Sequence, residues 1–107
     1  MNAGIKNTID FIDQLEIFAK TVDEKDLVSD SLGEYNAKEY LNTIVYEARD
    51  LIKYNEWIIT LEVSLDNLFE VHYQLNDKTI DLAKNALVSA SKYHEWAKEL
   101  EEMRMNP

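Results

Sequence analysis

Three carboxylates stand four residues apart in the middle of the chain: Glu62, Asp66 and Glu70. On a helix this spacing puts them on one face, where like charges repel each other and weaken the helix slightly. The surrounding segment, from Tyr54 to Asp77, contains no Lys or Arg that could offset the repulsion. Such a stripe suits two kinds of chemistry: acid–base catalysis by paired carboxylates, or electrostatic binding of a basic partner.

Catalysis is the weaker of these two interpretations. Carboxylates on exposed helix faces keep nearly normal pKa values and make poor general acids. Neither His72 nor His94 belongs to a Glu-x-x-His pair of the di-iron type, and Lys98 stands where a zincin helix needs its second histidine. The chain has no cysteine and no phosphate-binding glycine motif. The sequence therefore predicts a protein that is not an enzyme and that holds no cofactor or metal ion.

Apolar and aromatic side chains fall on the same arc as the three carboxylates, namely Ile59, Val63, Phe69 and Tyr73. Aromatic groups supply contact area in protein interfaces, and unpaired acids supply orientation and association rate. We therefore predict a partner-binding surface with Phe69 and Tyr73 as anchors. The alternative is that Ile59, Val63 and Phe69 pack inside the protein and leave the acids as a solvated edge. The predicted surface consists of Glu47, Asp50, Glu56, Glu62, Asp66, Phe69, Glu70 and Tyr73.

The whole chain is acidic, with a formal charge of −10 from 21 acidic and 11 basic residues. Nucleic acids and anionic membrane surfaces both require clustered Lys and Arg, so neither is expected to bind directly. Solubility alone is an alternative reason for a charge of this size. The first residues show no signal-peptide pattern, and no stretch approaches the roughly 20 apolar residues that span a bilayer. We expect a cytoplasmic protein.

Glycine and proline are scarce, since only Gly4, Gly33 and Pro107 occur. Folds built from many short strands need more turn-forming residues, whereas long helices joined by short loops need few. With 107 residues, 46% of them hydrophobic, the chain has the size of one domain with one core. The predicted fold class is all-α, an antiparallel four-helix bundle or a close variant, in a single domain covering residues 1–107.

Apolar periodicity predicts four helices and one long loop. The stretch 23–35 breaks the periodicity and is expected to be the loop, while 101–107 is expected to be a flexible tail. Asn36 and Asn76 are the expected N-caps of the second and fourth helices. His72 falls on the inward line of the third helix, where we expect a hydrogen-bonded or partly buried histidine. The predicted helices cover residues 6–22, 36–53, 55–72 and 77–100.

The segment from Leu51 to Leu87 combines these features in a recognisable order. Its motifs are Tyr54-Asn55-Glu56-Trp57, Leu61-Glu62, Leu65-Asp66-Asn67-Leu68, and Leu75-Asn76-Asp77 with Ile80. In order and spacing this segment resembles the MafI-like immunity proteins of bacterial polymorphic toxin and contact-dependent inhibition systems. The resemblance implies a small cytoplasmic protein that binds and neutralises one cognate toxin, commonly a nuclease.

The charge of the chain agrees with such a partner. A toxin that acts on RNA or DNA presents a basic cleft, which an acidic protein can occupy or flank. We therefore predict an immunity protein that inhibits a basic toxin domain through its acidic helix surface. Two alternatives stay open: a nucleic-acid mimic that regulates a basic host protein, and an acidic helical adaptor that forms a homodimer.

Overall fold

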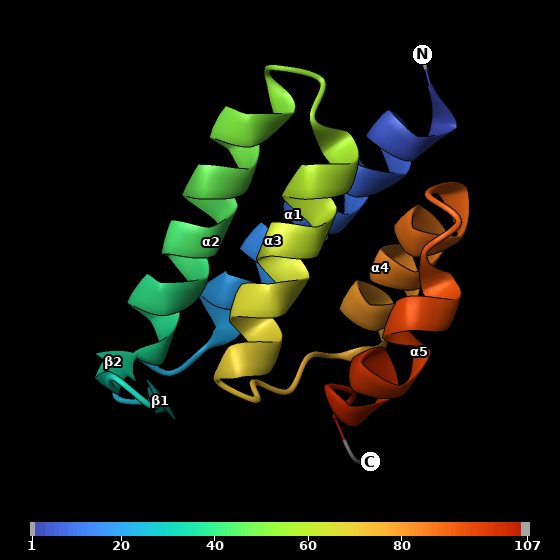
Figure 1. Cartoon of the computed structure of the whole chain (residues 1–107). Coiled ribbons are helices and arrows are strands. Elements are labelled where there is room, and N and C mark those ends of the chain that lie inside the picture. Colours follow the sequence, from blue (N-terminus) through green and yellow to red (C-terminus); the bar gives the residue numbers. More distant parts are fainter. Residues whose placement is uncertain (1, 106–107) are drawn as a thin grey trace.

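The computed structural model of the protein describes residues 2–105, which form five helices and one two-stranded sheet. The elements are α1 (Ala3–Thr21), β1 (Leu27–Asp30), β2 (Gly33–Asn36), α2 (Ala37–Ile52), α3 (Trp57–Glu70), α4 (Asp77–Ser89) and α5 (Tyr93–Glu102). Figure 1 shows α2 and α3 side by side, with α1 behind them and α4 and α5 stacked on the other side. The protein is therefore mostly helical, but it is neither purely all-α nor a clear four-helix bundle.

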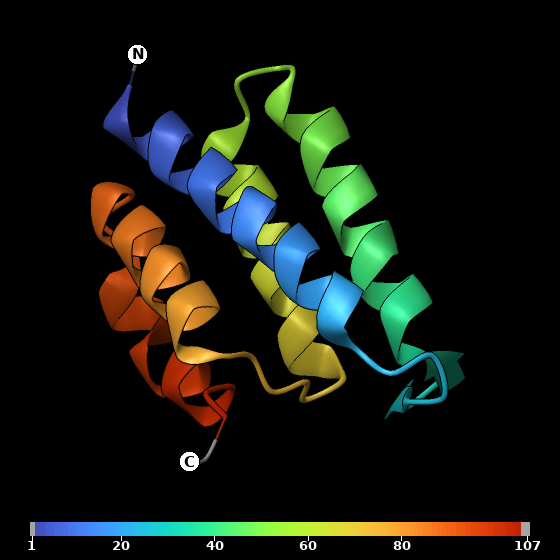
Figure 2. The same ribbon diagram turned by 180° about the vertical axis from the view of Figure 1, so that it is seen from behind.

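Helix α1 is the central packing element. It packs mainly against α4 and α2 and also contacts α3, and Figure 2 shows it crossing the back of the molecule. Phe11 and Leu15 of α1 share one core with Leu65 and Leu68 of α3, and all four side chains are fully buried. Because burial of apolar area is the main stabilising contribution to folding, this core fixes the position of α3.

The first turn of α3 rests on the first turn of α1. Trp57 is half-buried, and its six-membered ring occupies the space that a Cβ atom at Gly4 would need. Glycine at this position therefore permits the close approach of the two helices. Trp57, Leu65 and Leu68 belong to the motifs that carry the family resemblance, and in this structure all three have packing roles.

The predicted loop 23–35 is wrong in its second half, because it contains a β-hairpin. Strands β1 and β2 pair antiparallel, with Asp30 opposite Gly33. The Asp30 carboxylate closes the turn by accepting hydrogen bonds from the backbone N–H groups of Leu32 (2.8 Å) and Gly33 (3.1 Å). Val28 is buried and attaches the hairpin to the core. Two-residue hairpin turns are usually recognised by residues that favour positive φ, whereas none of residues 30–33 has a positive φ here.

The predicted fourth helix, 77–100, is wrong because the chain breaks it into α4 and α5. Ser91 adopts φ 57°, and the N–H group of Lys92 donates to the carbonyl of Leu87 at 2.9 Å. This helix-ending arrangement normally uses glycine at the left-handed position. His72 (φ 51°) terminates α3 in the same way, so that the helix stops at Glu70, two residues before the predicted end. The prediction of a partly buried His72 on the inward line of the helix is wrong too, because the residue is exposed.

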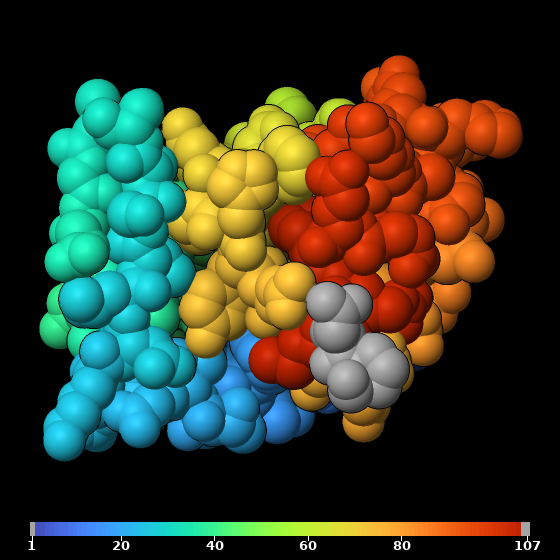
Figure 3. Space-filling view, turned by 90° about the horizontal axis from the view of Figure 1, so that it is seen from below, coloured from blue at the N-terminus to red at the C-terminus, as the bar shows by residue number. Residues whose placement is uncertain are grey.

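The predicted flexible tail, 101–107, is wrong for the residues that the structure describes. Helix α5 continues to Glu102, and Met103 is only 1% exposed. The backbone N–H of Leu75 donates to the carbonyl of Met103 at 2.7 Å, and the N–H of Met105 donates to the carbonyl of Leu75 at 2.9 Å. Figure 3 shows the connection between α3 and α4 (gold) beside the end of α5 (red). Residues 106 and 107 lie outside the described range.

Both predicted N-caps are confirmed. The Asn36 side chain accepts a hydrogen bond from the N–H of Glu39 at 3.0 Å, and the Asn76 side chain accepts one from the N–H of Thr79 at 3.1 Å. Each bond satisfies a backbone donor that has no partner within the first helical turn. Figure 1 shows that α2 and α3, joined by a short connection, run in opposite directions, as their predicted spacing required.

Candidate protein-binding surface

The predicted binding residues come mainly from α2 and α3, which lie next to each other. Asp50, Asp66 and Glu70 are exposed, as is Glu47. Burial raises the pKa of the Tyr40 hydroxyl, and the nearby charges of Glu70 and Glu47 raise it further. Carboxylates from both helices therefore lie around the same tyrosine. Below, "the acidic face" means the five carboxylates Glu47, Asp50, Glu62, Asp66 and Glu70.

Among residues 2–105, no Lys or Arg side chain is paired with a carboxylate of the acidic face. Arg49 pairs with acids of α1, and Arg104 with acids near the end of α5. The effect is visible at Asp66, where partial burial raises the pKa of the carboxyl group and the charge of Glu62 raises it further. A basic partner would supply the counter-charge that the fold does not provide.

Glu62 differs from the other members because α5 covers part of it. Its side chain is half-buried, and the Trp96 indole N–H donates to its carboxylate, with 3.5 Å between Nε1 and Oε2. The sequence predicts a single open stripe of Glu62, Asp66 and Glu70. The structure leaves Asp66 and Glu70 exposed and turns Glu62 toward α5.

A small hollow lies beside Asp66, between α3 and α5. Its volume is about 240 Å³, and its lining includes Phe69, Trp96, Glu95 and Glu99 as well as Asp66. Two further carboxylates thus border the acidic face. Sequence reasoning missed them because α5 was expected to continue α4 in a straight line instead of folding back toward α3.

The two predicted aromatic anchors are largely used for packing. Phe69 and Tyr73 are half-buried against the core, and the Tyr73 ring meets Phe18 of α1 edge-on, with 6.2 Å between ring centroids. Tyr73 lies beyond the end of α3, so the helical arc predicted for it does not apply. The apolar side chains exposed on this side of α3 are Ile59 (50%) and Val63 (37%). Internal packing therefore accounts for much of Phe69 but not for Ile59 or Val63.

Glu56 lies apart from the other predicted residues. It is the exposed N-cap residue of α3, and its side chain makes no capping hydrogen bond. It lies at the opposite end of the 14-residue helix α3 from Glu70, a distance of about 20 Å. The structure does not bring Glu56 into the acidic face, although a negative charge at a helix N-terminus is favourable there.

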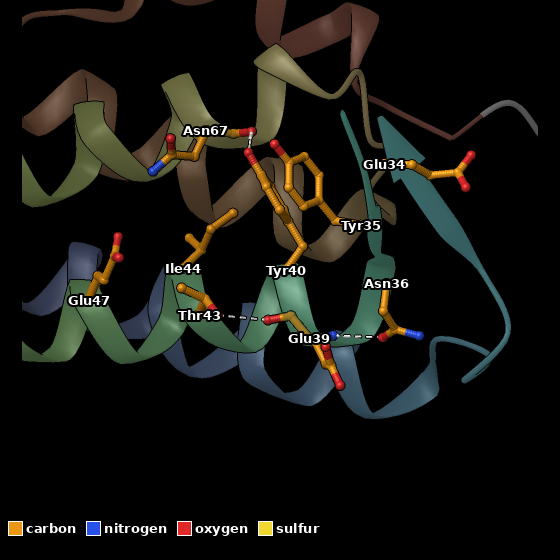
Figure 4. Close-up of a pocket in the computed structure, with 9 residues that line it drawn as sticks. All are labelled: Glu34, Tyr35, Asn36, Glu39, Tyr40, Thr43, Ile44, Glu47 and Asn67. Atoms are coloured by element: carbon orange, nitrogen blue, oxygen red, sulfur yellow. Dashed lines mark hydrogen bonds between the residues drawn. The ribbon is translucent and has the colours of Figure 1, made fainter. Parts of the chain in front are cut away.

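A larger hollow, called the tyrosine groove below, lies between α2, β2 and α3 (Figure 4). Its volume is about 550 Å³, and the Tyr40 hydroxyl bridges it by donating to the backbone carbonyl of Asn67 at 3.0 Å. Glu47 is the only predicted residue in its lining. The contributors from β2 were missed because the hairpin was expected to be a loop, and without the hairpin the residues of α2 had no second wall with which to form a groove. The available signal was the pair of short segments on either side of Ser31 and Leu32. The groove is lined chiefly by Glu34, Tyr35, Glu39, Tyr40, Ile44 and Glu47.

Within residues 2–105, no group of three or more His, Asp or Glu side chains is placed to hold a metal ion. No helix in this range combines the length and apolar character needed to cross a membrane. His72 and His94 are both exposed.

Comparisons of the chain with protein-family models, with curated proteins and with solved structures found no match. The resemblance of residues 51–87 to the MafI-like immunity proteins therefore stays a prediction.

Proposed function

We propose that this chain is an immunity protein that binds a basic bacterial toxin domain with its acidic face. It would act in the cytoplasm and have no catalytic activity of its own. One observation carries the proposal: five carboxylates on the adjacent helices α2 and α3 lack salt bridges within residues 2–105, in a protein whose Arg49 and Arg104 neutralise acids elsewhere. The resemblance to MafI-like immunity proteins supplies the class of partner, a toxin that commonly acts on nucleic acid.

Physical chemistry links this surface to such a partner. Sites that bind RNA or DNA carry clustered Lys and Arg, which attract a surface of opposite charge. Complementary fields raise association rates by about 10- to 1000-fold at low salt. Ile59 and Val63 are exposed on α3 together with the acids, and they offer apolar area for the centre of a contact. An acidic protein seated on or beside a nuclease cleft would exclude the polynucleotide substrate.

Rescue of bacterial growth tests the proposal. The domain encoded immediately upstream of this chain's gene is expressed alone and together with the chain. We expect growth arrest in the first case and growth in the second. The triple variant Glu62→Lys, Asp66→Lys, Glu70→Lys should lose protection. Because Glu62 accepts a hydrogen bond from Trp96, a double variant restricted to Asp66 and Glu70 separates loss of binding from loss of packing.

A second triple variant provides the control. Glu24→Lys, Asp26→Lys and Glu102→Lys produce the same change of formal charge, from −10 to −4, because each reversal adds two positive charges. None of these three side chains forms a salt bridge within residues 2–105. We expect the control to protect as well as the native chain. If both triple variants lost protection, or if both kept it, the proposed role of the acidic face would be contradicted.

The two alternative functions predict different results. A nucleic-acid mimic aimed at a host protein would be displaced by polynucleotide and would not depend on the upstream gene. An adaptor that works as a homodimer would show self-association that rises with protein concentration. Sedimentation at several concentrations, and competition with polynucleotide in a binding assay, distinguish both from an immunity protein.

A further inference from the structure

We propose that the tyrosine groove receives an arginine side chain of the partner. This inference rests on the proposed function only in taking the partner to be a basic protein. The groove is about 550 Å³ in volume and opens between α2, the hairpin strand β2 and α3. Figure 4 shows Tyr35 and Tyr40 next to each other, with Glu47 further along α2 on one side and Glu34 of β2 on the other.

The hydroxyl groups in the groove already donate their hydrogen atoms within the protein. Tyr40 donates to a backbone carbonyl of α3 at 3.0 Å, Tyr35 donates to the Asp30 carboxylate at 3.2 Å, and Thr43 donates to a backbone carbonyl one turn earlier in α2 at 2.9 Å. These hydroxyls can therefore only accept hydrogen bonds from a ligand. The matching ligand group is rich in donors, and a guanidinium has five N–H donors and no acceptor.

The charges around the groove have a single sign. Glu34, Glu39 and Glu47 lie in its lining, which contains no Lys or Arg, and none of the three forms a salt bridge within residues 2–105. Glu70 is close enough that its charge adds to the effect of burial in raising the pKa of Tyr40. A cation in the groove would relieve this accumulated negative charge.

The aromatic rings favour arginine over lysine. Tyr35 and Tyr40 are half-buried, with ring centroids 5.6 Å apart and planes tilted by 36°. A guanidinium is planar and weakly hydrated, so it stacks on aromatic rings while it pairs with carboxylates. A lysine ammonium is a compact and strongly hydrated charge, which gains less from an aromatic wall. The aromatic wall, to which the hairpin contributes Tyr35, therefore gives a preference for arginine over lysine that the carboxylates alone do not give.

A peptide titration followed by NMR tests this inference without knowledge of the natural partner. The isotope-labelled protein is titrated with the blocked peptide acetyl-Gly-Arg-Gly-amide and, separately, with the same peptide in which citrulline replaces arginine. Citrulline keeps the shape of the side chain and removes its charge. We expect saturable shifts centred on Tyr35, Tyr40 and Ile44 with the arginine peptide only. Equal shifts with both peptides, or shifts that spread over the surface without saturation, would overturn the inference.

A single substitution then locates the site. Glu47→Gln keeps the shape of an exposed side chain and removes its charge. We expect it to weaken binding of the arginine peptide about two- to fivefold, as for the loss of one exposed ion pair. Glu102→Gln makes the same charge change on α5 and should leave the affinity unchanged; equal weakening by both variants would also overturn the inference. If growth rescue fails while the peptide saturates the groove, the immunity function is wrong and the arginine site stands. If rescue depends on the acidic face while no peptide binds, only the groove assignment is wrong.

Discussion

Carboxylates cluster both on the acidic face and at the end of α5, but among the described residues they are paired with a cation only at the end of α5. At the end of α5, Arg104 contacts Asp77 at 2.6 Å, Asp81 at 3.1 Å and Glu101 at 2.8 Å. Its hydrogen bond holds the pKa of Glu101 below the ordinary value. On the acidic face no carboxylate forms a salt bridge within residues 2–105, and the pKa of Asp66 is raised instead.

The difference indicates where this protein uses charge for folding. Arg104 joins the first turn of α4 to the end of α5, next to the backbone hydrogen bonds of Leu75 with Met103 and Met105. Ion pairs and backbone hydrogen bonds therefore hold the same two segments together at this end of the molecule. The acids of α3 join no elements through ion pairs and repel one another along the helix. Their arrangement costs some stability, which is what a surface kept for binding would show.

Charge reversal in the two regions should have its largest effect on association. The double variant Asp66→Lys, Glu70→Lys should slow association with the proposed toxin partner by about 10- to 1000-fold at low salt, because steering by the acidic face is lost. The loss should shrink at high salt, where screening already weakens steering. Stopped-flow fluorescence at two ionic strengths measures both effects.

The matched reversal is Asp77→Lys, Asp81→Lys, which changes the net charge equally but acts on the partners of Arg104. We expect this variant to unfold more easily while it associates far faster than the acidic-face variant. Equal slowing by both pairs would mean that net charge, and not the position of the carboxylates, steers the encounter.

Loss of Arg104 should have the next largest effect, this time on stability. Its side chain is 28% exposed and bonded to three carboxylates. Single exposed ion pairs contribute up to about 1 kcal/mol, and networks contribute more, so Arg104→Ala should lower the free energy of unfolding by about 1–2 kcal/mol. Arg104→Lys should recover only part of the loss, since an ammonium cannot reproduce the forked geometry. Urea denaturation measures the change, and a value near zero would remove the contrast between the two regions.

The helices α1 to α3 and the start of α4 could be predicted because their apolar residues recur with the helical period and the caps of α2 and α4 carry a direct chemical signal. Asn36 and Asn76 each precede a residue whose N–H group they cap, and that geometry follows from residue type and spacing. The excess of acids could also be recognised, since counting Lys and Arg does not depend on the fold.

The remaining structure could not be predicted because its turns use unexpected residues. Ser91 adopts a left-handed backbone conformation, with φ of 57°, where glycine is the usual marker. Without that marker the break between α4 and α5 is invisible in the sequence, and so is the return of Trp96 to Glu62. The hairpin is hidden for a similar reason, because Asp30 closes its turn with a side chain. These elements supply the second wall of each hollow beside the acidic face.

Titration of one carboxylate in each region compares the two regions most directly, although its expected effect on stability is the smallest. The folded-state pKa of Asp66 is raised, first by burial and then by the charge of Glu62. The ionised group therefore lowers the stability of the fold. This loss of stability disappears as the pH falls through the raised pKa. The folded-state pKa of Glu101 is lowered, first by the hydrogen bond from Arg104. Its stabilisation is present above the unfolded pKa and is lost as the pH falls through the folded one.

Two neutral substitutions convert these opposite shifts into opposite changes of stability. Asp66→Asn should raise the free energy of unfolding at neutral pH by about 0.2–0.5 kcal/mol, the size of one like-charge pair on a helix, whereas Glu101→Gln should lower it. Both differences should vanish in acid, because the native carboxyl groups are then protonated as well. Urea denaturation at neutral and acidic pH measures the stability, and NMR titration measures the two pKa values. If Asp66 titrated below its ordinary value, a counter-charge would already be present, and the acidic face would have no need of a basic partner to supply one.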